Sequence, residues 1–212
     1  MMVKIDNITP IISRDFNSNT YIFNDIIVDP GSSLNINYLL ENIKLAGLSI
    51  DNINKIINTH CHFDHTGADE YLQKEFGLDV YLHPLDADAI IRHDDEETVA
   101  SHFAASTPDI DVKIIEEGDK FYDFEVIHTP GHTHGSICLY NGQSLITGDT
   151  VFSEGSFGRT DFKTGSSIDL KKSLKKLNEL DVSNLFTGHG PYVESNGNQY
   201  LALSYKNSSL LF

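Results

Sequence analysis

A cluster of polar side chains directly follows an apolar segment of this sequence and limits the folds that the chain can adopt. Residues 54–60, NKIINTH, lead into THCHFDHTG, in which His60, His62 and His65 lie close together with Asp64 between them. The apolar run predicts a buried strand whose carboxyl end carries polar chemistry. Imidazoles placed side by side repel one another when protonated and need partners when buried. A divalent metal ion is therefore the expected partner of this cluster.

The spacing of these side chains separates them in direction. His60 and His62 are two residues apart on an extended segment and project to the same side, whereas Asp64 and His65 begin the turn into the next helix and can face a different centre. Neutral imidazole and carboxylate suit Zn, Fe, Mn or Co, and no cysteine pattern of a structural zinc site accompanies them. One metal ion does not easily accommodate all four ligands.

Three more polar residues stand beside glycines at the ends of predicted strands. They are His132 after Gly131, Asp149 after Gly148, and His189 within Gly188–Gly190. Small neighbours let the backbone turn sharply and leave room for a side chain to reach inward. These positions extend the set of candidate ligands beyond the first cluster.

Strands and helices alternate along the rest of the chain. The pattern of apolar residues and turn signals predicts strands at 3–8, 19–29 with a hairpin turn at Asn24–Asp25, 54–60, 79–83, 112–116, 121–128, 136–140, 143–148 and 184–190, and helices at 33–48, 67–76, 84–92 and 167–178. The acidic and polar segment 93–111 is a candidate lid or insertion. This alternation favours an α/β fold with two mixed sheets covered by helices.

Charge and cysteine content exclude several classes of partner. The 212 residues include 15 Lys and Arg against 31 Asp and Glu, a formal net charge of −16. Nucleic acids and anionic membrane surfaces are therefore not expected partners, because their binding relies on cationic side chains. The two cysteines, Cys61 and Cys138, are too few for a disulfide framework. The first residues, MMVKIDNITPII, contain no long apolar segment, and no run of about 18 apolar residues occurs. A cytoplasmic protein is expected.

Four motifs in order resemble the metallo-β-lactamase superfamily: HCHFDH (60–65), GHTHGS (131–136), TGDTVF (147–152) and TGHG (187–190). The resemblance covers the chain from Val3 to about Val193. It implies an αββα sandwich of two mixed β-sheets flanked by helices, with a dinuclear site at one edge of the sheets. By position, the first metal would take His60, His62 and His132, the second would take Asp64, His65 and His189, and Asp149 would bridge them.

Within the superfamily the sequence is most similar to the glyoxalase II-like group (hydroxyacylglutathione hydrolases) and to the related persulfide dioxygenases. GRTDF (158–162) is shared by both groups, Cys61 favours the dioxygenases, and the ending TGHGP (187–191) favours the hydrolases. We expect residues 1–212 to form a single metallo-β-lactamase-like domain. The C-terminal helical domain that holds glutathione in full-length glyoxalase II is not expected here.

The resemblance implies a metallo-hydrolase that cleaves a small acyl thioester with a metal-bound hydroxide as nucleophile. Two divalent ions are expected, with zinc as the first choice and iron or manganese as alternatives. Asp64 is the predicted catalytic residue, both a ligand and the group that orients the hydroxide. The predicted partner is a small molecule, the ester of a low-molecular-weight thiol.

Several alternatives remain open at the level of sequence. The first is a persulfide dioxygenase with one Fe(II) held by a subset of the same ligands. A nuclease or lactonase of the superfamily and a metal-binding module without enzymatic activity rank lower. The oligomeric state is open, and both a monomer and a homodimer are compatible with the sequence.

Three further residues are candidates for substrate contact. Arg159 could bind a substrate carboxylate or simply pair with Asp161. His134, two residues after His132, could line the pocket, and Tyr192 could touch substrate or pack as an ordinary aromatic residue.

Overall fold

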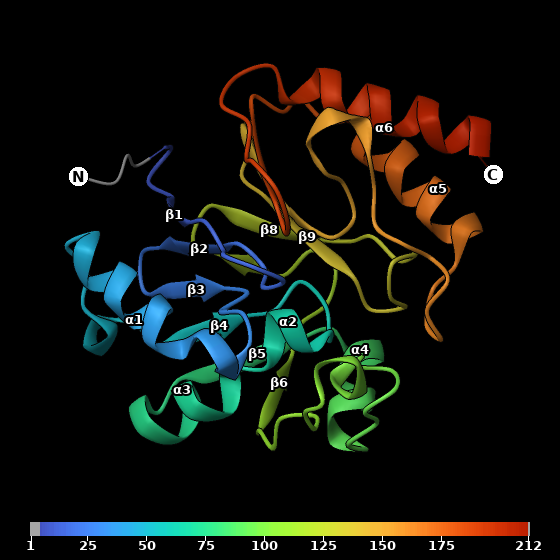
Figure 1. Cartoon of the computed structure of the whole chain (residues 1–212). Coiled ribbons are helices and arrows are strands. Elements are labelled where there is room, and N and C mark those ends of the chain that lie inside the picture. The colour runs from blue at the N-terminus through green and yellow to red at the C-terminus, as the bar shows by residue number, and fades with distance from the viewer. Residues whose placement is uncertain (1–4, 212) are drawn as a thin grey trace. The chain divides into compact units, whose positions relative to one another are not determined.

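The computed structural model describes residues 5–211, and the chain divides into two compact units. The first unit runs up to Leu82 and includes Ala87–Ile114; the second comprises His83–Asp86 and the chain from Ile115 onward. Each unit contains one mixed β-sheet with helices packed on it, and Figure 1 traces the elements in chain order. The prediction of two mixed sheets with flanking helices is confirmed.

The sheet of the first unit has six strands in chain order: β1 (Thr9–Ile11), β2 (Thr20–Phe23), β3 (Ile26–Val28), β4 (Lys55–Ile57), β5 (Asp79–Leu82) and β6 (Val112–Ile114). β1, β2 and β3 pair antiparallel, and the pairs from β3 to β6 are parallel. The turn between β2 and β3 falls at Asn24–Asp25 as predicted. The carboxyl ends of β3 and β4 therefore lie next to each other.

Helices α1 (Ile36–Leu45) and α3 (Asp69–Phe76) pack on one face of this sheet. The strands supply a row of cross-strand neighbours, and the helices supply the facing side chains. The row is Ile22, Ile27, Ile56 and Val80, and the helix residues are Leu39, Ile43 and Leu72. All seven are buried, and each is worth about 1.5–3 kcal/mol of burial. This packing fixes the end of β4, from which the loop to the short helix α2 (Phe63–Thr66) departs.

The sheet of the second unit has the order β11 (Asn184–Thr187), β10 (Ser144–Gly148), β9 (Ile137–Tyr140), β8 (Phe124–His128) and β7 (Lys120–Phe121). Only the β10–β11 pair of this sheet is parallel. Helices α5 (Ser167–Leu177) and α6 (Gly197–Leu211) cover one face of it. The core there includes Ile127, Cys138, Leu145, Leu185, Leu170, Leu174, Leu177 and Leu201.

Some elements differ from the sequence-based predictions. The predicted strand 121–128 is interrupted after β7, where Tyr122 has a positive φ of 59°. Asp6 and Asn7 also have positive φ and form a turn within the predicted strand 3–8, of which Val3 and Lys4 lie outside the described residues. Left-handed backbone at such residues is typical of turns and not of strands.

Helix α6 was not predicted. Its fully buried positions are Gly197, Leu201, Ser204 and Ser208, of which only Leu201 is a large apolar residue. Tyr200 and Tyr205 also pack against the core but are only half-buried. Hydrophobic periodicity is the main sequence signal for a helix. Because the fully buried positions are mostly small residues, the signal is weak.

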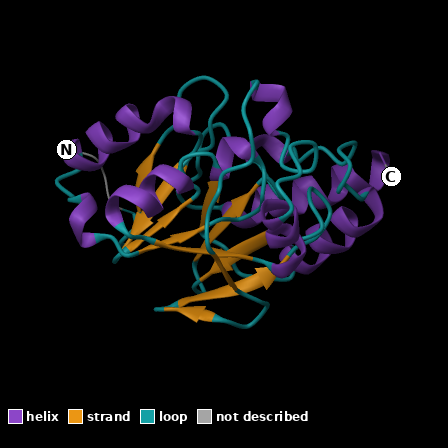
Figure 2. Ribbon diagram, turned by 90° about the horizontal axis from the view of Figure 1, so that it is seen from below, coloured by secondary structure: helices purple, strands orange, loops and turns teal. Residues whose placement is uncertain are grey.

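Residues 93–111, the candidate lid or insertion, are joined to each other by local contacts. They follow helix α4 (Pro84–Ile91) and contain one short 3₁₀ helix, Ala100–Phe103, between turns and loops (teal in Figure 2). The Asp95 carboxylate accepts hydrogen bonds from the backbone N–H and the hydroxyl of Thr107, at 2.7 and 2.8 Å.

Within residues 5–211, no helix combines the length and apolar character needed to cross a bilayer.

Candidate functional site

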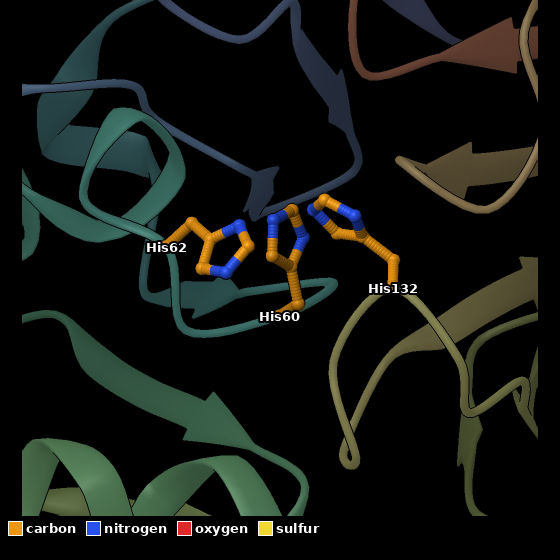
Figure 3. A group of neighbouring side chains, drawn as sticks. All are labelled: His60, His62 and His132. Atoms are coloured by element: carbon orange, nitrogen blue, oxygen red, sulfur yellow. The ribbon is translucent and has the colours of Figure 1, made fainter. Parts of the chain in front are cut away.

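In the first unit, the loop after β4 and helix α2 carry the predicted histidine cluster. His60, His62 and His65 are at most 3% exposed, and the ring of His60 lies 4.6 Å from that of His62 and 4.0 Å from that of His65, between centroids. Figure 3 shows His60 and His62 leaving this loop and, from the second unit, His132 on the loop after β8. Three imidazoles this close and this buried are stable when neutral, the form that binds metals.

Asp29, directly after β3, orients the histidine cluster through hydrogen bonds to Thr59 and His65. Its buried carboxylate accepts hydrogen bonds from the backbone N–H of Thr59 at 2.7 Å, the hydroxyl of Thr59 at 2.7 Å and Nδ1 of His65 at 2.9 Å. The proton of His65 is thereby held on Nδ1, and Nε2 becomes the nitrogen able to bind a metal. Asp29 is not among the site residues predicted from the sequence. Its signal was an acidic residue at the end of an apolar strand, before Pro30–Gly31.

The same hydrogen bonds determine the protonation of His60. The only hydroxyl proton of Thr59 is donated to Asp29, so the Thr59 oxygen, 3.1 Å from Nδ1 of His60, accepts from that nitrogen. His60 therefore also presents Nε2 in its metal-binding form. Nε2 of His65 lies 3.7 Å from Oδ2 of Asp64, a distance too long for a hydrogen bond.

A second buried carboxyl group, that of Asp69 on α3, lies close to this network and accepts a hydrogen bond from the side-chain amide of Asn58. Burial raises the pKa of Asp69 well above its usual value, the hydrogen bond from the Asn58 amide lowers it, and the nearby Asp29 carboxylate raises it again. Desolvation is the largest of these effects, so Asp69 is favoured in its neutral form. Of these two acidic residues, Asp29 is the one hydrogen-bonded to a predicted ligand, His65.

In the second unit, three strand ends carry the remaining candidates. His132 follows β8, Asp149 follows β10 and His189 follows β11. Oδ2 of Asp149 lies 3.6 Å from Nε2 of His132 and 3.5 Å from Nε2 of His189. Both distances are too long for hydrogen bonds. They match the roughly 3.4 Å that separates two ligand atoms bound at 2.0–2.2 Å to one tetrahedral ion.

In the second unit, the backbone around Asp149 allows close approach only because of glycine. A Cβ on Gly158 would lie 2.0 Å from the carbonyl oxygen of Asp149, and a Cβ on Gly188 would lie 2.2 Å from Oδ1 of Asp149. Nδ1 of the buried His132 donates to the carbonyl of Arg159 at 2.8 Å, so Nε2 is again the nitrogen left to bind a metal. The GRTDF segment thus contributes its backbone to the site.

The three predicted substrate contacts are placed as follows. The exposed guanidinium of Arg159 donates to both carboxylate oxygens of Asp161, at 2.9 and 2.7 Å. The His134 side chain is exposed, and Tyr192 is half-buried and stacked on Phe186 at 5.9 Å between ring centroids. The pairing of Arg159 matches the structural alternative in the sequence analysis. Contact of these three residues with substrate stays a prediction.

The seven predicted ligands offer imidazole nitrogens and carboxylate oxygens, four of them in the first unit and three in the second. The donor set consists of imidazole nitrogens and carboxylates, and hydrogen bonds at Nδ1 fix His60, His65 and His132 in the tautomer that binds through Nε2. Such support from a carboxylate, carbonyl or hydroxyl is the usual surrounding of metal-binding histidines. The residues present fit divalent metal ions of the zinc and iron type.

Comparison with known proteins identifies the family. Residues 14–189 match the model of the metallo-β-lactamase superfamily, and the chain belongs to this superfamily. It is 40% identical over 186 residues to a probable metallo-hydrolase of Methanocaldococcus jannaschii, covering 82% of this chain and 88% of that protein. A hydroxyacylglutathione hydrolase of Wigglesworthia glossinidia brevipalpis is 30% identical over 211 residues, covering 94% and 72%.

Solved structures give the same result for the fold. The protein TTHA1623 in a di-iron-bound form is 30% identical with a TM-score of 0.75, covering 92% of this chain and 95% of that one. The B3 metallo-β-lactamase BLEG-1 is 29% identical with the same TM-score, covering 91% and 95%. The fold is that of the metallo-β-lactamases, and the protein is a member of a metallo-hydrolase superfamily with His and Asp side chains able to bind metal.

Proposed function

We propose that this protein is a metal-dependent hydrolase that cleaves a small acyl thioester, in the manner of the glyoxalase II-like group. The observation that carries the proposal is the complete set of seven ligand-type side chains, with His60, His65 and His132 oriented by hydrogen bonds at Nδ1. Similarity to hydroxyacylglutathione hydrolases supports the thioester as the substrate class.

We assign the ligands as the superfamily resemblance implies. His60, His62 and His132 would hold one ion, Asp64, His65 and His189 would hold a second, and Asp149 would bridge the two. The di-iron-bound form of the relative TTHA1623 supports a count of two. When bound, such ions lower the pKa of a coordinated water toward 7 and polarise a carbonyl oxygen.

The side chains of the protein supply orientation and proton handling. The carboxylate of Asp64, which is 14% exposed, accepts a hydrogen bond from the attacking water and thereby directs its lone pair toward the thioester carbonyl. Asp29 keeps His65 in one tautomer through the reaction, and the Arg159 carbonyl does the same for His132. The thiolate leaves without protonation by the protein, because it is a stable anion compared with an alkoxide.

The position of Cys61 bears on the dioxygenase alternative. Cys61, the residue that favoured a persulfide dioxygenase, is fully buried in an apolar cluster with Leu82, Ala87, Ala89 and Ile90. It acts as a small core residue, as is common for buried cysteines. The hydrolase is therefore the better-supported of the two functions.

Metal analysis combined with a substrate panel tests the proposal. We expect anaerobically purified protein to hold about two metal equivalents and to release free thiol from S-lactoylglutathione or another small acyl thioester. Replacement Asp64→Asn should lower kcat by more than about 100-fold, whereas the exposed control Asp51→Asn should not. Metal-loaded protein that cleaves no thioester contradicts the proposal, and oxygen uptake with a thiol persulfide would establish the dioxygenase instead.

A further inference from the structure

A buried carboxylate outside the ligand set holds the loop that carries His132. Asp86 lies in the first turn of α4, belongs to the second unit and is 1% exposed. One of its oxygens accepts from the hydroxyl of Thr133 at 2.7 Å, and the other accepts from the backbone N–H of Gly135 at 2.7 Å. Thr133 directly follows His132, so the two hydrogen bonds hold the loop in place immediately after this predicted metal ligand.

The direction of the hydrogen bonds around Asp86 is determined by the protons available. The hydroxyl of Thr133 has one proton and donates it to Asp86, so the hydroxyl of Ser136, 2.7 Å away, donates to Thr133. The backbone N–H of Thr133 in turn donates to the Ser136 oxygen at 3.0 Å. The Asp86 carboxylate therefore determines the direction in which the hydroxyl groups of Thr133 and Ser136 donate their protons.

The rest of the loop is tied in the same way. The backbone N–H of Gly131 donates to the carbonyl of Thr133 at 2.8 Å, and that of Ser166 donates to the carbonyl of Gly131 at 2.8 Å. A Cβ on Gly135 would lie 2.6 Å from the Asp86 carboxylate, so the loop approaches this side chain as closely as glycine permits. His132 is thus presented by a loop with little freedom to turn.

Burial of a carboxylate is unfavourable unless its hydrogen bonds compensate. Removing such an ion from water is unfavourable even after relaxation, and the two charge-assisted hydrogen bonds from Thr133 and Gly135 offset this cost. The gain is directional, because both bonds are made to residues beside His132. This placement favours a role for Asp86 in orientation.

We propose that Asp86 is a positioning residue that sets the direction of the His132 imidazole and, through it, the affinity of the metal centre. This inference rests on the proposed function only in taking His132 as a metal ligand. Asp86 acts through the loop and has no contact with substrate in the proposed reaction.

Replacement Asp86→Asn is the test. The amide has the shape of the carboxylate but only one acceptor oxygen, so its NH₂ group faces one of the two donors. We expect Zn²⁺ affinity, measured by competition with a chelator on folded protein, to fall about 10-fold, and the visible absorption of the Co²⁺-loaded protein to change. The matched control is Asp88→Asn, in the same helix and with the same change of charge, because Asp88 is exposed and paired with Arg92. It should leave both readouts unchanged.

Further variants keep the test decisive. If Asp86→Asn does not fold, Ser136→Ala, which removes the donor to Thr133, should still lower Zn²⁺ affinity. Folded Asp86→Asn protein with unchanged Zn²⁺ affinity and an unchanged Co²⁺ spectrum overturns the proposal. His132→Ala separates the two hypotheses: if this variant binds Zn²⁺ normally, the proposed metal centre is wrong, whereas a loss there without a loss in Asp86→Asn removes only the positioning role.

Discussion

At the scale of single residues, hydrogen bonds at Nδ1 decide which imidazole nitrogen can bind a metal. His65 donates to Asp29, His60 donates to Thr59 and His132 donates to the carbonyl of Arg159. In each case the second nitrogen, Nε2, is left in the form that coordinates a cation. The chemistry of the centre therefore depends on residues that are not ligands.

His83 gives a pH-dependent prediction at this scale. Burial, with a smaller contribution from the stacked His128 ring at 4.0 Å, lowers the pKa of His83 from 6.5 to about 4, and Glu117 partly opposes the shift. Between these values the unfolded chain binds a proton that the folded protein does not. Stability from this residue is therefore fully present above pH 6.5 and is lost as the pH falls toward 4, by roughly 3 kcal/mol.

The measurement is urea denaturation of His83→Gln and the native protein from pH 4 to pH 7. Because glutamine does not titrate, we expect the free energy of unfolding to depend less steeply on pH in the variant, whatever constant offset the lost stacking produces. His102→Gln, at an exposed position, is the control and should keep the native slope. Equal slopes in all three proteins would show that His83 is not the titrating group.

At the scale of elements, the ends of strands and helices place the chemistry. The loops after β4, β8, β10 and β11 each carry predicted ligands, and the carboxyl ends of β3 and β4 bring Asp29 to Thr59. The start of helix α5 is hydrogen-bonded to the loop that carries His132, because the backbone N–H of its N-cap residue, Ser166, donates to the carbonyl of Gly131. The stability of this helix start and the form of the loop are therefore connected.

Removal of the α5 cap is a test at this scale. The Ser166 hydroxyl accepts from the backbone N–H of Asp169 at 3.2 Å and lies 2.8 Å from its carboxylate. Replacement Ser166→Ala should lower the free energy of unfolding by about 1 kcal/mol, seen as a lower urea midpoint with an unchanged m value. The neighbouring Ser167→Ala, past the cap position, should have a much smaller effect; equal losses would argue against capping as the cause.

At the scale of the whole molecule, the proposed ligands come from both compact units. Removal of metal should therefore lower the melting temperature, and a free ion at 100 times its Kd should add about 2.7 kcal/mol of stability. We expect hydrogen exchange to slow on metal addition in residues 58–66 of the first unit and in residues 129–136 of the second. Protection confined to one of these segments would contradict a centre that draws ligands from both.

Local sequence was sufficient for the ligand types and for most of the elements that carry them. Apolar runs ending in His or Asp predicted β4, β8, β10 and β11, and the turn signal at Asn24–Asp25 predicted the β2–β3 hairpin. These features depend on neighbouring residues, so they can be inferred without knowing the rest of the fold. Helix α6 escaped prediction because its buried face is largely Gly and Ser.

The residue types and their spacing were enough to predict the candidate metal ligands, their order and the strand ends that carry them. The hydrogen bonds that hold these side chains could not be predicted in this way: Asp29 lies 36 residues from His65, and Asp86 lies 47 residues from Thr133. Hydrogen bonds between such distant positions form only after the sheets and helices have packed. The residues next to an Asp in the sequence do not indicate which distant residue its carboxylate will contact in the folded protein.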